Sequence, residues 1–231
     1  HKEYRRQRQM CIRDRDITMK KYKGIIFDLD GVICCTDQYH ERAWREMAEE
    51  SGIYFDPAVS NRLRGVSREE SLEIILEHAG KVFSPEEKKK MAEKKNAIYI
   101  KLLDRMSPGD LEEDVRSTLE QLRNRGCLLA IGSSSKNTRK ILDKIGLGNY
   151  FDAVCDGNEI THSKPDPEVF LKAAGKMGLA VSECLVVEDA CAGISAASAG
   201  GFDSAGLGDA AKDKNVTWAL NTFGDLKNIV K

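Results

Sequence analysis

Two carboxylates in the segment FDLDG, Asp28 and Asp30, directly follow the apolar run GIIF. An ionised carboxylate costs free energy in apolar surroundings unless a cation or hydrogen bonds replace the lost water. Side chains two residues apart on a strand share one face, so both carboxylates could reach one substrate. One could attack phosphorus, while the other, with a raised pKa, gives and takes protons on the substrate oxygen. Taken alone, the pair could also be a strand end that faces solvent.

Further polar residues stand near the predicted ends of other strands. Ser133 lies in GSSSKN, Lys164 in the loop SKPDP, and the adjacent Glu188 and Asp189 in VVED. Ligands of open α/β sheets bind at the carboxyl ends of the strands. We therefore expect these groups to converge on the two aspartates of FDLDG.

The expected cluster contains four carboxylates, which cannot gather around one point without cations. Mg²⁺ favours carboxylate oxygens and is commonly completed by a substrate phosphate. Lys164 adds a positive charge, the Ser133 hydroxyl can bind a phosphate oxygen, and SSSKN at a helix start offers backbone N–H groups. Such a site suits phosphoryl transfer, in which positioning and charge neutralisation do most of the catalysis. Taken singly, Lys164 reads as a solvated lysine, and Glu188 and Asp189 could cap a helix.

The elements that must position these groups alternate between strand and helix in the second half of the chain. Helical patterns separate the predicted strands. Their alternation predicts an α/β fold with a Rossmann-like parallel sheet and helices on both faces. The predicted strands are at residues 23–29, 127–133, 151–156, 184–189 and 203–207.

Residues 37–105 interrupt this alternation with helical signals only. Ser67 and Ser84 each begin a capping box, S-x-x-E, and Gly52 favours the end of an earlier helix whose Trp44 is expected in a core. The segment SPG then breaks the chain. The predicted domains are an α/β catalytic core at 19–35 and 107–231 and an inserted all-helical cap domain at 36–106.

The overall composition argues against two classes of partner. A net charge of −1 gives no sign of nucleic-acid binding, and no apolar stretch approaches the roughly 20 residues of a membrane helix. Seven cysteines without a Cys-x-x-Cys pair indicate reduced thiols, so we expect a cytoplasmic protein, and we expect a monomer. Residues 1–18 are interpreted as a non-native or disordered extension, with a basic binding arm as the alternative.

The four segments FDLDG, GSSSKN, SKPDP and VVEDACAG resemble, in this order, the motifs of the haloacid dehalogenase superfamily, and the resemblance covers residues 19–231. In that superfamily, an aspartate at position 30 belongs to phosphatases and phosphomutases, which weighs against a dehalogenase or a phosphonatase. The helical insert, through TDQYHERAW and RLRGVSREESL, is similar to the cap of the beta-phosphoglucomutase family. The chain departs from some relatives at Arg64, where they have lysine, and at Cys35, where they have aspartate.

The resemblance implies roles for residues around the first segment. Asp28 is the expected nucleophile, Asp30 the general acid/base, and His40 the residue that orients Asp30. Thr36 is expected at the hinge between the domains. The expected Mg²⁺ ligands are Asp28, the backbone carbonyl of Asp30, Glu188 and Asp189.

Phosphate binding is expected in both domains. Ser133 and Lys164 are expected to bind the transferring phosphate. Arg68, the predicted first residue of a capped helix, is expected to hold a second phosphate, because a guanidinium and a helix N-terminus both favour an anion. Arg68 could instead pair with Glu69 or Glu70. The expected substrate-binding residues are Trp44, Gly65, Val66, Ser67, Arg68, Lys95, Asn96, Ser135 and Asn137.

The predicted function is that of a Mg²⁺-dependent sugar phosphomutase. The resemblance implies interconversion of beta-D-glucose 1-phosphate and glucose 6-phosphate through an aspartyl phosphate and a glucose 1,6-bisphosphate intermediate, with closure of the cap excluding water. Two alternatives stay open: a phosphatase of the same fold that acts on a small sugar phosphate, and a non-catalytic phosphosugar-binding protein. Small-molecule sugar phosphates are the expected partners.

Overall fold

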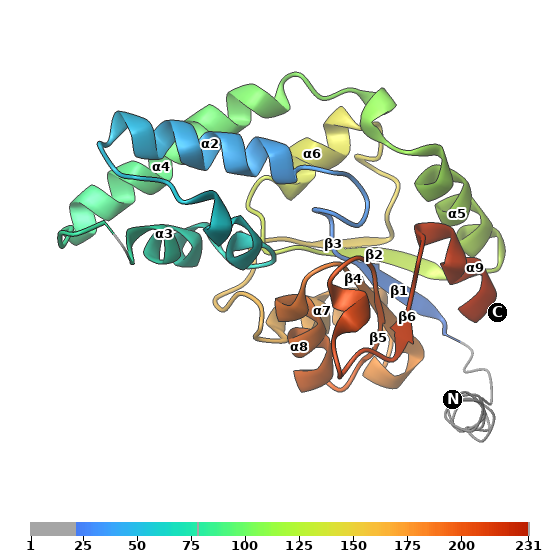
Figure 1. The fold of residues 1–231 in the computed structure, drawn as a ribbon. Coiled ribbons are helices and arrows are strands. Elements are labelled where there is room, and N and C mark those ends of the chain that lie inside the picture. Colours follow the sequence, from blue (N-terminus) through green and yellow to red (C-terminus); the bar gives the residue numbers. More distant parts are fainter. Residues whose placement is uncertain (1–21, 78, 231) are drawn as a thin grey trace, which may run out of the picture.

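The structure, a computed structural model, describes residues 22–77 and 79–230. The extension expected at residues 1–18 lies outside the described residues. Within the described part of the chain, no helix is both long and apolar enough to cross a membrane. Figure 1 shows a sheet with helices on both of its faces and a further group of helices beyond one end of its strands.

The core is a six-stranded parallel sheet with the strand order β3-β2-β1-β4-β5-β6. The central strand β1 places Phe27 level with Ile131 on β2 and Val187 on β4. From β1 the chain builds the sheet first toward β3 and then, from β4 onward, in the opposite direction. The strands are β1 (Gly24–Phe27), β2 (Leu128–Gly132), β3 (Ala153–Cys155), β4 (Cys184–Glu188), β5 (Asp203–Gly206) and β6 (Trp218–Ala219).

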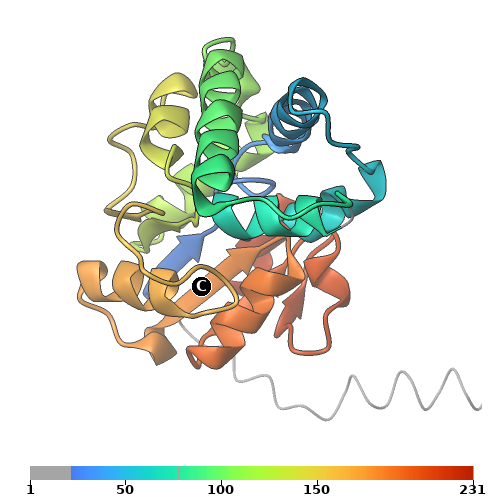
Figure 2. The same ribbon diagram turned by 90° about the vertical axis from the view of Figure 1, so that its left-hand side faces the viewer.

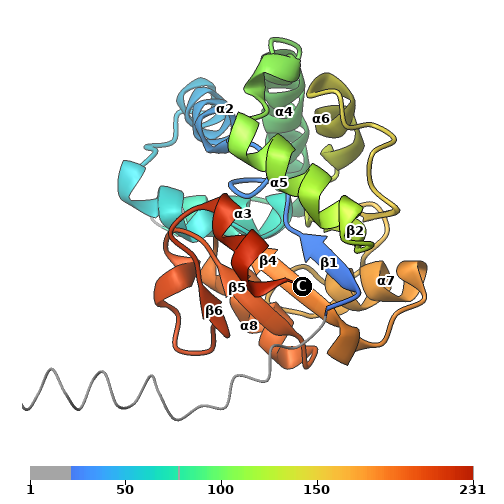
Figure 3. The same ribbon diagram turned by 90° about the vertical axis from the view of Figure 1, so that its right-hand side faces the viewer.

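Alternation along β1 divides the core between the two faces of the sheet, because successive strand residues point to opposite sides. Ile25 and Phe27 pack with the buried residues of α5, α6 and α9, whereas Ile26 packs with those of α7 and α8. Figure 3 shows α5 and α9 side by side on the first face. The helices are α5 (Glu113–Asn124), α6 (Thr138–Lys144), α7 (Glu168–Met177), α8 (Cys191–Ala199) and α9 (Leu226–Ile229).

The segment between β1 and α5 is helical and has a hydrophobic cluster of its own. Trp44 and Met47 of its first helix are buried there with Leu72 and Ile75 of the second. Figure 2 shows these helices as a separate group above the sheet. The helices are α2 (Asp37–Glu50), α3 (Arg68–Leu76) and α4 (Pro85–Leu103), with a 3-10 helix at Pro57–Leu63.

The predicted fold class, a Rossmann-like parallel sheet with a helical cap region, is confirmed, and both capping boxes are present at Ser67 and Ser84. The domain limits at 36 and 106 stay a prediction. The sequence patterns missed β6 and α9, because two strand residues and one helical turn are too short to show a periodicity. The strand expected at 23–29 is shorter, since β1 ends at Phe27.

Candidate active site

The two central strands bring the predicted carboxylates together. Asp28 directly follows β1, Glu188 is the last residue of the adjacent strand β4, and Asp189 follows it. The order of the strands reverses between β1 and β4, which is where open α/β sheets leave a crevice for a ligand. Asp28 and Asp30 therefore lie in the loop beyond the strand, whereas the spacing argument expected them on the strand itself.

Lys164 forms ion pairs with two of these carboxylates. Its Nζ atom donates hydrogen bonds to Asp28 Oδ1 at 2.5 Å and to Glu188 Oε1 at 2.7 Å, and all three side chains are buried. Burial raises the pKa of Asp28 well above its usual value, although the positive charge of Lys164 opposes this. Burial alone would lower the pKa of Lys164, but the two carboxylates outweigh it and raise that pKa.

Glu188 is fixed by backbone groups on its other oxygen. Oε2 accepts hydrogen bonds from the N–H groups of Asp189 and Ala190, each at 2.8 Å. Gly193 in α8 packs directly on this carboxylate, and a Cβ atom at that position would overlap Glu188 Oε1. A side chain at position 193 would therefore displace a residue of the carboxylate cluster.

Three carboxylates fit a divalent cation. One oxygen each from Asp28, Glu188 and Asp189 lies within 4.8 Å of the others, and all three side chains are buried. Mg²⁺ prefers such hard oxygen ligands and keeps several waters or a substrate phosphate in its remaining positions. Burial, together with the charge of Glu188, raises the pKa of Asp189. This raised pKa reports an excess of buried negative charge, which a cation would relieve.

Arg64, which precedes α3 in the cap, reaches across to this cluster. Its Nη2 atom lies 2.5 Å from Asp189 Oδ2 and 2.8 Å from Asp37 Oδ2 at the start of α2. The sequence analysis gave Arg64 no role beyond a departure from some relatives. The structure makes it a direct link between the cap and the carboxylate cluster.

Asp30 faces the cap. Its Oδ1 atom accepts a hydrogen bond from Thr36 Oγ1 and lies 3.6 Å from His40 Nε2. Burial alone would raise the pKa of Asp30, but the nearby His40, the hydrogen bond from Thr36 and the charge of Lys164 outweigh it, so the pKa lies below the usual value. The expectation of a raised pKa at Asp30 is therefore wrong, and the cause is a partner that lies ten residues further along the chain.

A cavity of about 220 Å³ opens between the cap and these core loops. Arg64, Glu69 and Lys136 also line it, although the sequence analysis assigned them no contact with substrate. Thr36, Ser67, Asn96, Lys164 and Glu188 are predicted site residues that are not among its lining residues. The predicted residues that line it are Asp28, Asp30, His40, Trp44, Gly65, Val66, Arg68, Lys95, Ser133, Ser135, Asn137 and Asp189.

The predicted residues outside the lining have identifiable contacts. Ser67 caps α3, since its Oγ atom accepts a hydrogen bond from Glu70 N at 3.2 Å. Asn96 Oδ1 accepts a hydrogen bond from Asn137 Nδ2 at 2.9 Å, which joins α4 to the loop after β2. Trp44, in contrast, is one of the predicted residues that line the cavity; it is 2% exposed and also packs in the core of the cap.

Arg68 begins α3 as predicted, at the cavity wall. The alternative in which it pairs with Glu69 or Glu70 has less support, because those carboxylates contact other groups. Glu69 Oε1 lies 3.0 Å from Lys136 Nζ in the core, and Glu70 Oε2 accepts a hydrogen bond from Ser67 N at 3.0 Å. The guanidinium of Arg68 therefore stays suited to an anion in the cavity.

The chain belongs to the haloacid dehalogenase-like hydrolases, whose family model matches residues 22–201. It is an enzyme of that superfamily, and the superfamily resemblance predicted from the four segments is confirmed. Such enzymes typically use Mg²⁺, in agreement with the carboxylate cluster.

Three proteins similar to this chain carry the names of two related enzymes, a phosphomutase and a sugar phosphatase. The chain is 40% identical to a beta-phosphoglucomutase of Bacillus subtilis (strain 168) over 188 residues, which cover 80% of this chain and 83% of the relative. It is 35% identical to a fructose-1-phosphate phosphatase of Escherichia coli (strain K12), covering 80% and 96%. The crystal structure of a beta-phosphoglucomutase from Clostridium difficile superimposes with a TM-score of 0.83 at 35% identity, covering 89% of this chain and 93% of that one.

Proposed function

We propose that the protein is a Mg²⁺-dependent sugar phosphomutase that interconverts beta-D-glucose 1-phosphate and glucose 6-phosphate. The observation that carries the proposal is a single cavity with anion-binding groups on opposite sides. Ser133 lines the cavity on the core side, where Asp28 also lies, and Arg68 lines it on the cap side. A bisphosphate intermediate needs one such group for each phosphate. The similarity to two beta-phosphoglucomutases supports this choice.

The proposed first half-reaction begins with a phosphate already on Asp28. The 6-hydroxyl of beta-glucose 1-phosphate attacks this phosphorus, the bond between phosphorus and the Asp28 oxygen breaks, and Asp30 accepts the hydroxyl proton. The lowered pKa of Asp30 suits this step, because the carboxylate enters it ionised. The product is glucose 1,6-bisphosphate, with Asp28 returned to its free carboxylate.

The second half-reaction uses the same groups after the bisphosphate has turned over. Asp28 attacks the phosphorus at O1, the bond between this phosphorus and O1 breaks, and Asp30 returns its proton to O1. A phosphate dianion beside Asp30 would raise its pKa and so favour the protonated form that this step needs. Asp28, Glu188 and Asp189 would hold Mg²⁺, which supplies charge neutralisation for the transferring phosphate when bound.

A sugar phosphatase is the second candidate, and the identity of 35% to a fructose-1-phosphate phosphatase supports it. The two activities differ in the acceptor of the phosphoryl group, which is a sugar hydroxyl in the mutase and water in the phosphatase. Arg64 and Lys136 form polar contacts between cap and core that favour a closed cavity, and closure limits the access of water, which favours the mutase.

The monomeric state and the cytoplasmic location stay predictions.

The deciding experiment measures both products. The protein is incubated with beta-glucose 1-phosphate, Mg²⁺ and a trace of glucose 1,6-bisphosphate, and glucose 6-phosphate and inorganic phosphate are quantified. Glucose 6-phosphate in large excess, with a requirement for bisphosphate, is the expected result. Inorganic phosphate as the main product would favour the phosphatase. An Asp28→Asn variant serves as the control and is expected to lose both activities.

A further inference from the structure

Asp156 is a buried carboxylate that the proposed reaction does not use. It is 1% exposed and lies in the loop that follows β3. Every other charged side chain that is buried within the described residues belongs to the set predicted for the active site. Because burial of an ionised carboxylate costs free energy, the contacts that compensate for it at Asp156 indicate what the residue does.

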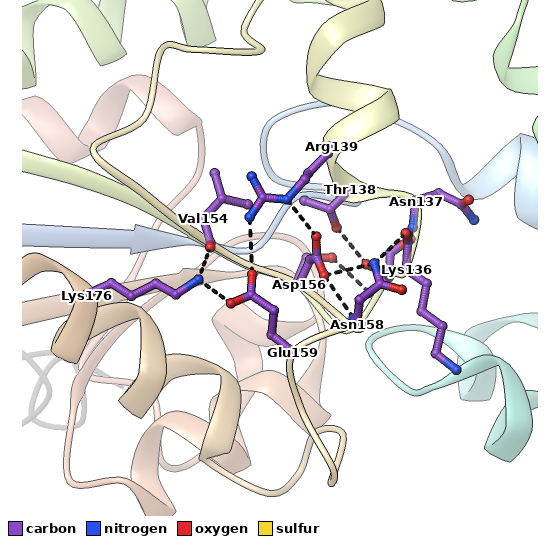
Figure 4. Close-up of polar contacts among 11 residues, drawn as sticks. Lys136, Asn137, Thr138, Arg139, Val154, Asp156, Asn158, Glu159 and Lys176 are labelled. Carbon is purple, nitrogen blue, oxygen red and sulfur yellow. Dashed lines mark hydrogen bonds and ion pairs between the residues drawn. The ribbon is translucent and has the colours of Figure 1, made fainter.

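The Asp156 carboxylate is held on both oxygens. Oδ1 accepts hydrogen bonds from Asn158 N at 2.9 Å and from Asn158 Nδ2 at 3.0 Å, and Oδ2 lies 3.3 Å from Arg139 Nε (Figure 4). The Asn158 amide also donates to the backbone oxygen of Lys136 at 3.0 Å. Asp156 therefore orients an amide that in turn holds the backbone of the loop after β2.

This loop, residues 133–137, is held at two more points by the last residue of β3 and the segment that follows it. Ser133 N donates to Cys155 O at 3.1 Å, and Gly157 N donates to Ser135 O at 3.1 Å. A Cβ atom at Gly157 would overlap the backbone oxygen of Ser134, so the two segments are in direct contact. The attachment is therefore continuous from Ser133 to Lys136.

The attachment decides how the peptide groups of the loop point. In a trans peptide, the C=O and the following N–H point in opposite directions. Fixing the carbonyls of Ser135 and Lys136 against the segment after β3 therefore turns the N–H groups of Lys136 and Asn137 away from that segment, and Asn137 N donates to Ser135 Oγ at 3.3 Å within the loop. All five residues of the loop line the active-site cavity, whereas Asp156 and Asn158 do not.

We propose that Asp156 and Asn158 are positioning residues that hold the loop at residues 133–137 in the orientation that phosphate binding requires. Neither residue lines the cavity: Asn158 acts through the backbone oxygen of Lys136, and Asp156 acts by orienting Asn158. The inference rests on the proposed function in one respect, namely that this loop binds a phosphate group. It gives the buried charge of Asp156 a reason, because a rigid backbone keeps donors aimed at an anion before the anion arrives.

An Asn158→Ala variant tests the proposal, because Asn158 is exposed and the substitution leaves the ion pair between Asp156 and Arg139 in place. The dissociation constant of inorganic phosphate is measured by titration calorimetry in the presence of Mg²⁺, together with the melting temperature. We expect phosphate to bind about fivefold to tenfold more weakly, as expected for one lost orienting hydrogen bond, with little change in melting temperature. An Asp156→Asn variant, which keeps one acceptor oxygen, is expected to show a smaller loss.

Glu159→Gln is the matched control. The Glu159 carboxylate lies in the same segment but contacts Arg139 and Lys176 and not the loop at residues 133–137 (Figure 4). It is expected to bind phosphate like the unaltered protein. Unchanged phosphate affinity in Asn158→Ala, or an equal loss in Glu159→Gln, would overturn the positioning role alone. An unaltered protein that binds no phosphate with Mg²⁺ would overturn the assignment of the loop and, with it, the proposed function.

Discussion

The Nζ atom of Lys95 in α4 lies 2.8 Å from Nδ1 of His40 in α2. While Lys95 is charged it can only donate, so in that state this contact places the ring proton of a neutral His40 on Nε2. Nε2 is the atom that faces Asp30, at 3.6 Å from Oδ1. One cap helix thus sets the tautomer of the histidine that the other cap helix presents to the proposed acid/base.

Lys95→Met is expected to stabilise the protein most at low pH. Burial and the charge of Arg68 lower the pKa of Lys95 to about 7, against about 10.4 in the unfolded chain. Between these pH values the unfolded chain binds more protons than the folded protein, so the free energy of unfolding rises with pH. Below pH 7 the folded protein carries the full free-energy penalty of a charged lysine in a buried position. The variant lacks this penalty, which amounts to about 5 kcal/mol at most. Urea unfolding between pH 6 and pH 10 measures the difference.

Lys94→Met on the same helix is the control for this pH dependence. Lys94 is partly exposed and pairs with Glu50 on the surface, at 2.6 Å. We expect its stability to follow that of the unaltered protein at every pH. The interpretation of Lys95 would be wrong if both variants showed the same difference from the unaltered protein across the pH range.

Lys164→Met is expected to destabilise the metal-free protein by about 3–5 kcal/mol, because it leaves buried carboxylates without their counterion. Asp28 and Glu188 are the two that lose a hydrogen bond. Mg²⁺ would replace part of the missing charge, so it should raise the melting temperature of the variant more than that of the unaltered protein. Thermal unfolding with EDTA and with Mg²⁺ measures both effects. Lys172→Met removes an exposed lysine that pairs with Glu168, so it should change neither the stability of the metal-free protein nor the rise in melting temperature with Mg²⁺. An equally small effect of Lys164→Met would contradict the prediction.

The positions of Asp28 and Glu188 could be predicted from sequence because each marks the end of a buried strand. Strand ends are readable from an apolar run that stops at a polar residue, and the switch in strand order then places two adjacent ends together. Lys164 was identified only through its segment, since a lysine in a loop shows no pattern that indicates burial. The pKa of Asp30 was predicted with the wrong sign, because the sequence does not reveal how closely His40 approaches it.

The contacts between cap and core could not be predicted from sequence. Arg64 meets Asp189 across 125 positions of the chain, and Lys136 meets Glu69 across 67 positions. Such contacts depend on how two separately packed units dock, and hydrophobic periodicity describes each unit without describing their relative placement. The role proposed for Asp156 has the same origin, since the segment after β3 contacts the loop after β2 only in the folded sheet.

Gly193→Ala is expected to impair Mg²⁺ binding, because the new methyl group would displace Glu188 from the carboxylate cluster. Perturbing the support of a metal ligand typically costs about tenfold to hundredfold in metal affinity or activity. The Mg²⁺ concentration that gives half-maximal turnover measures the effect. Gly175→Ala in α7 is the matched control, since the new methyl group meets no atom within 4 Å beyond its chain neighbours and the backbone of its own helix, and it should stabilise the helix by about 0.5–1 kcal/mol. Equal Mg²⁺ requirements in the two variants would contradict the prediction.

Reversing the charge of Glu69 is expected to shift the proposed reaction from isomerisation toward hydrolysis. The Glu69 carboxylate lies 3.0 Å from Lys136 Nζ and joins the cap to the core at the wall of the cavity. In Glu69→Lys two cations face each other, so the cap opens more often and water reaches the aspartyl phosphate. Because both side chains are exposed, the pair contributes only about 0.5 kcal/mol, and the ratio of inorganic phosphate to glucose 6-phosphate should rise roughly twofold to threefold. The double variant Glu69→Lys/Lys136→Glu restores the pairing and should bring the ratio back. A ratio that stays high in the double variant would show that the charge at position 69 acts without Lys136.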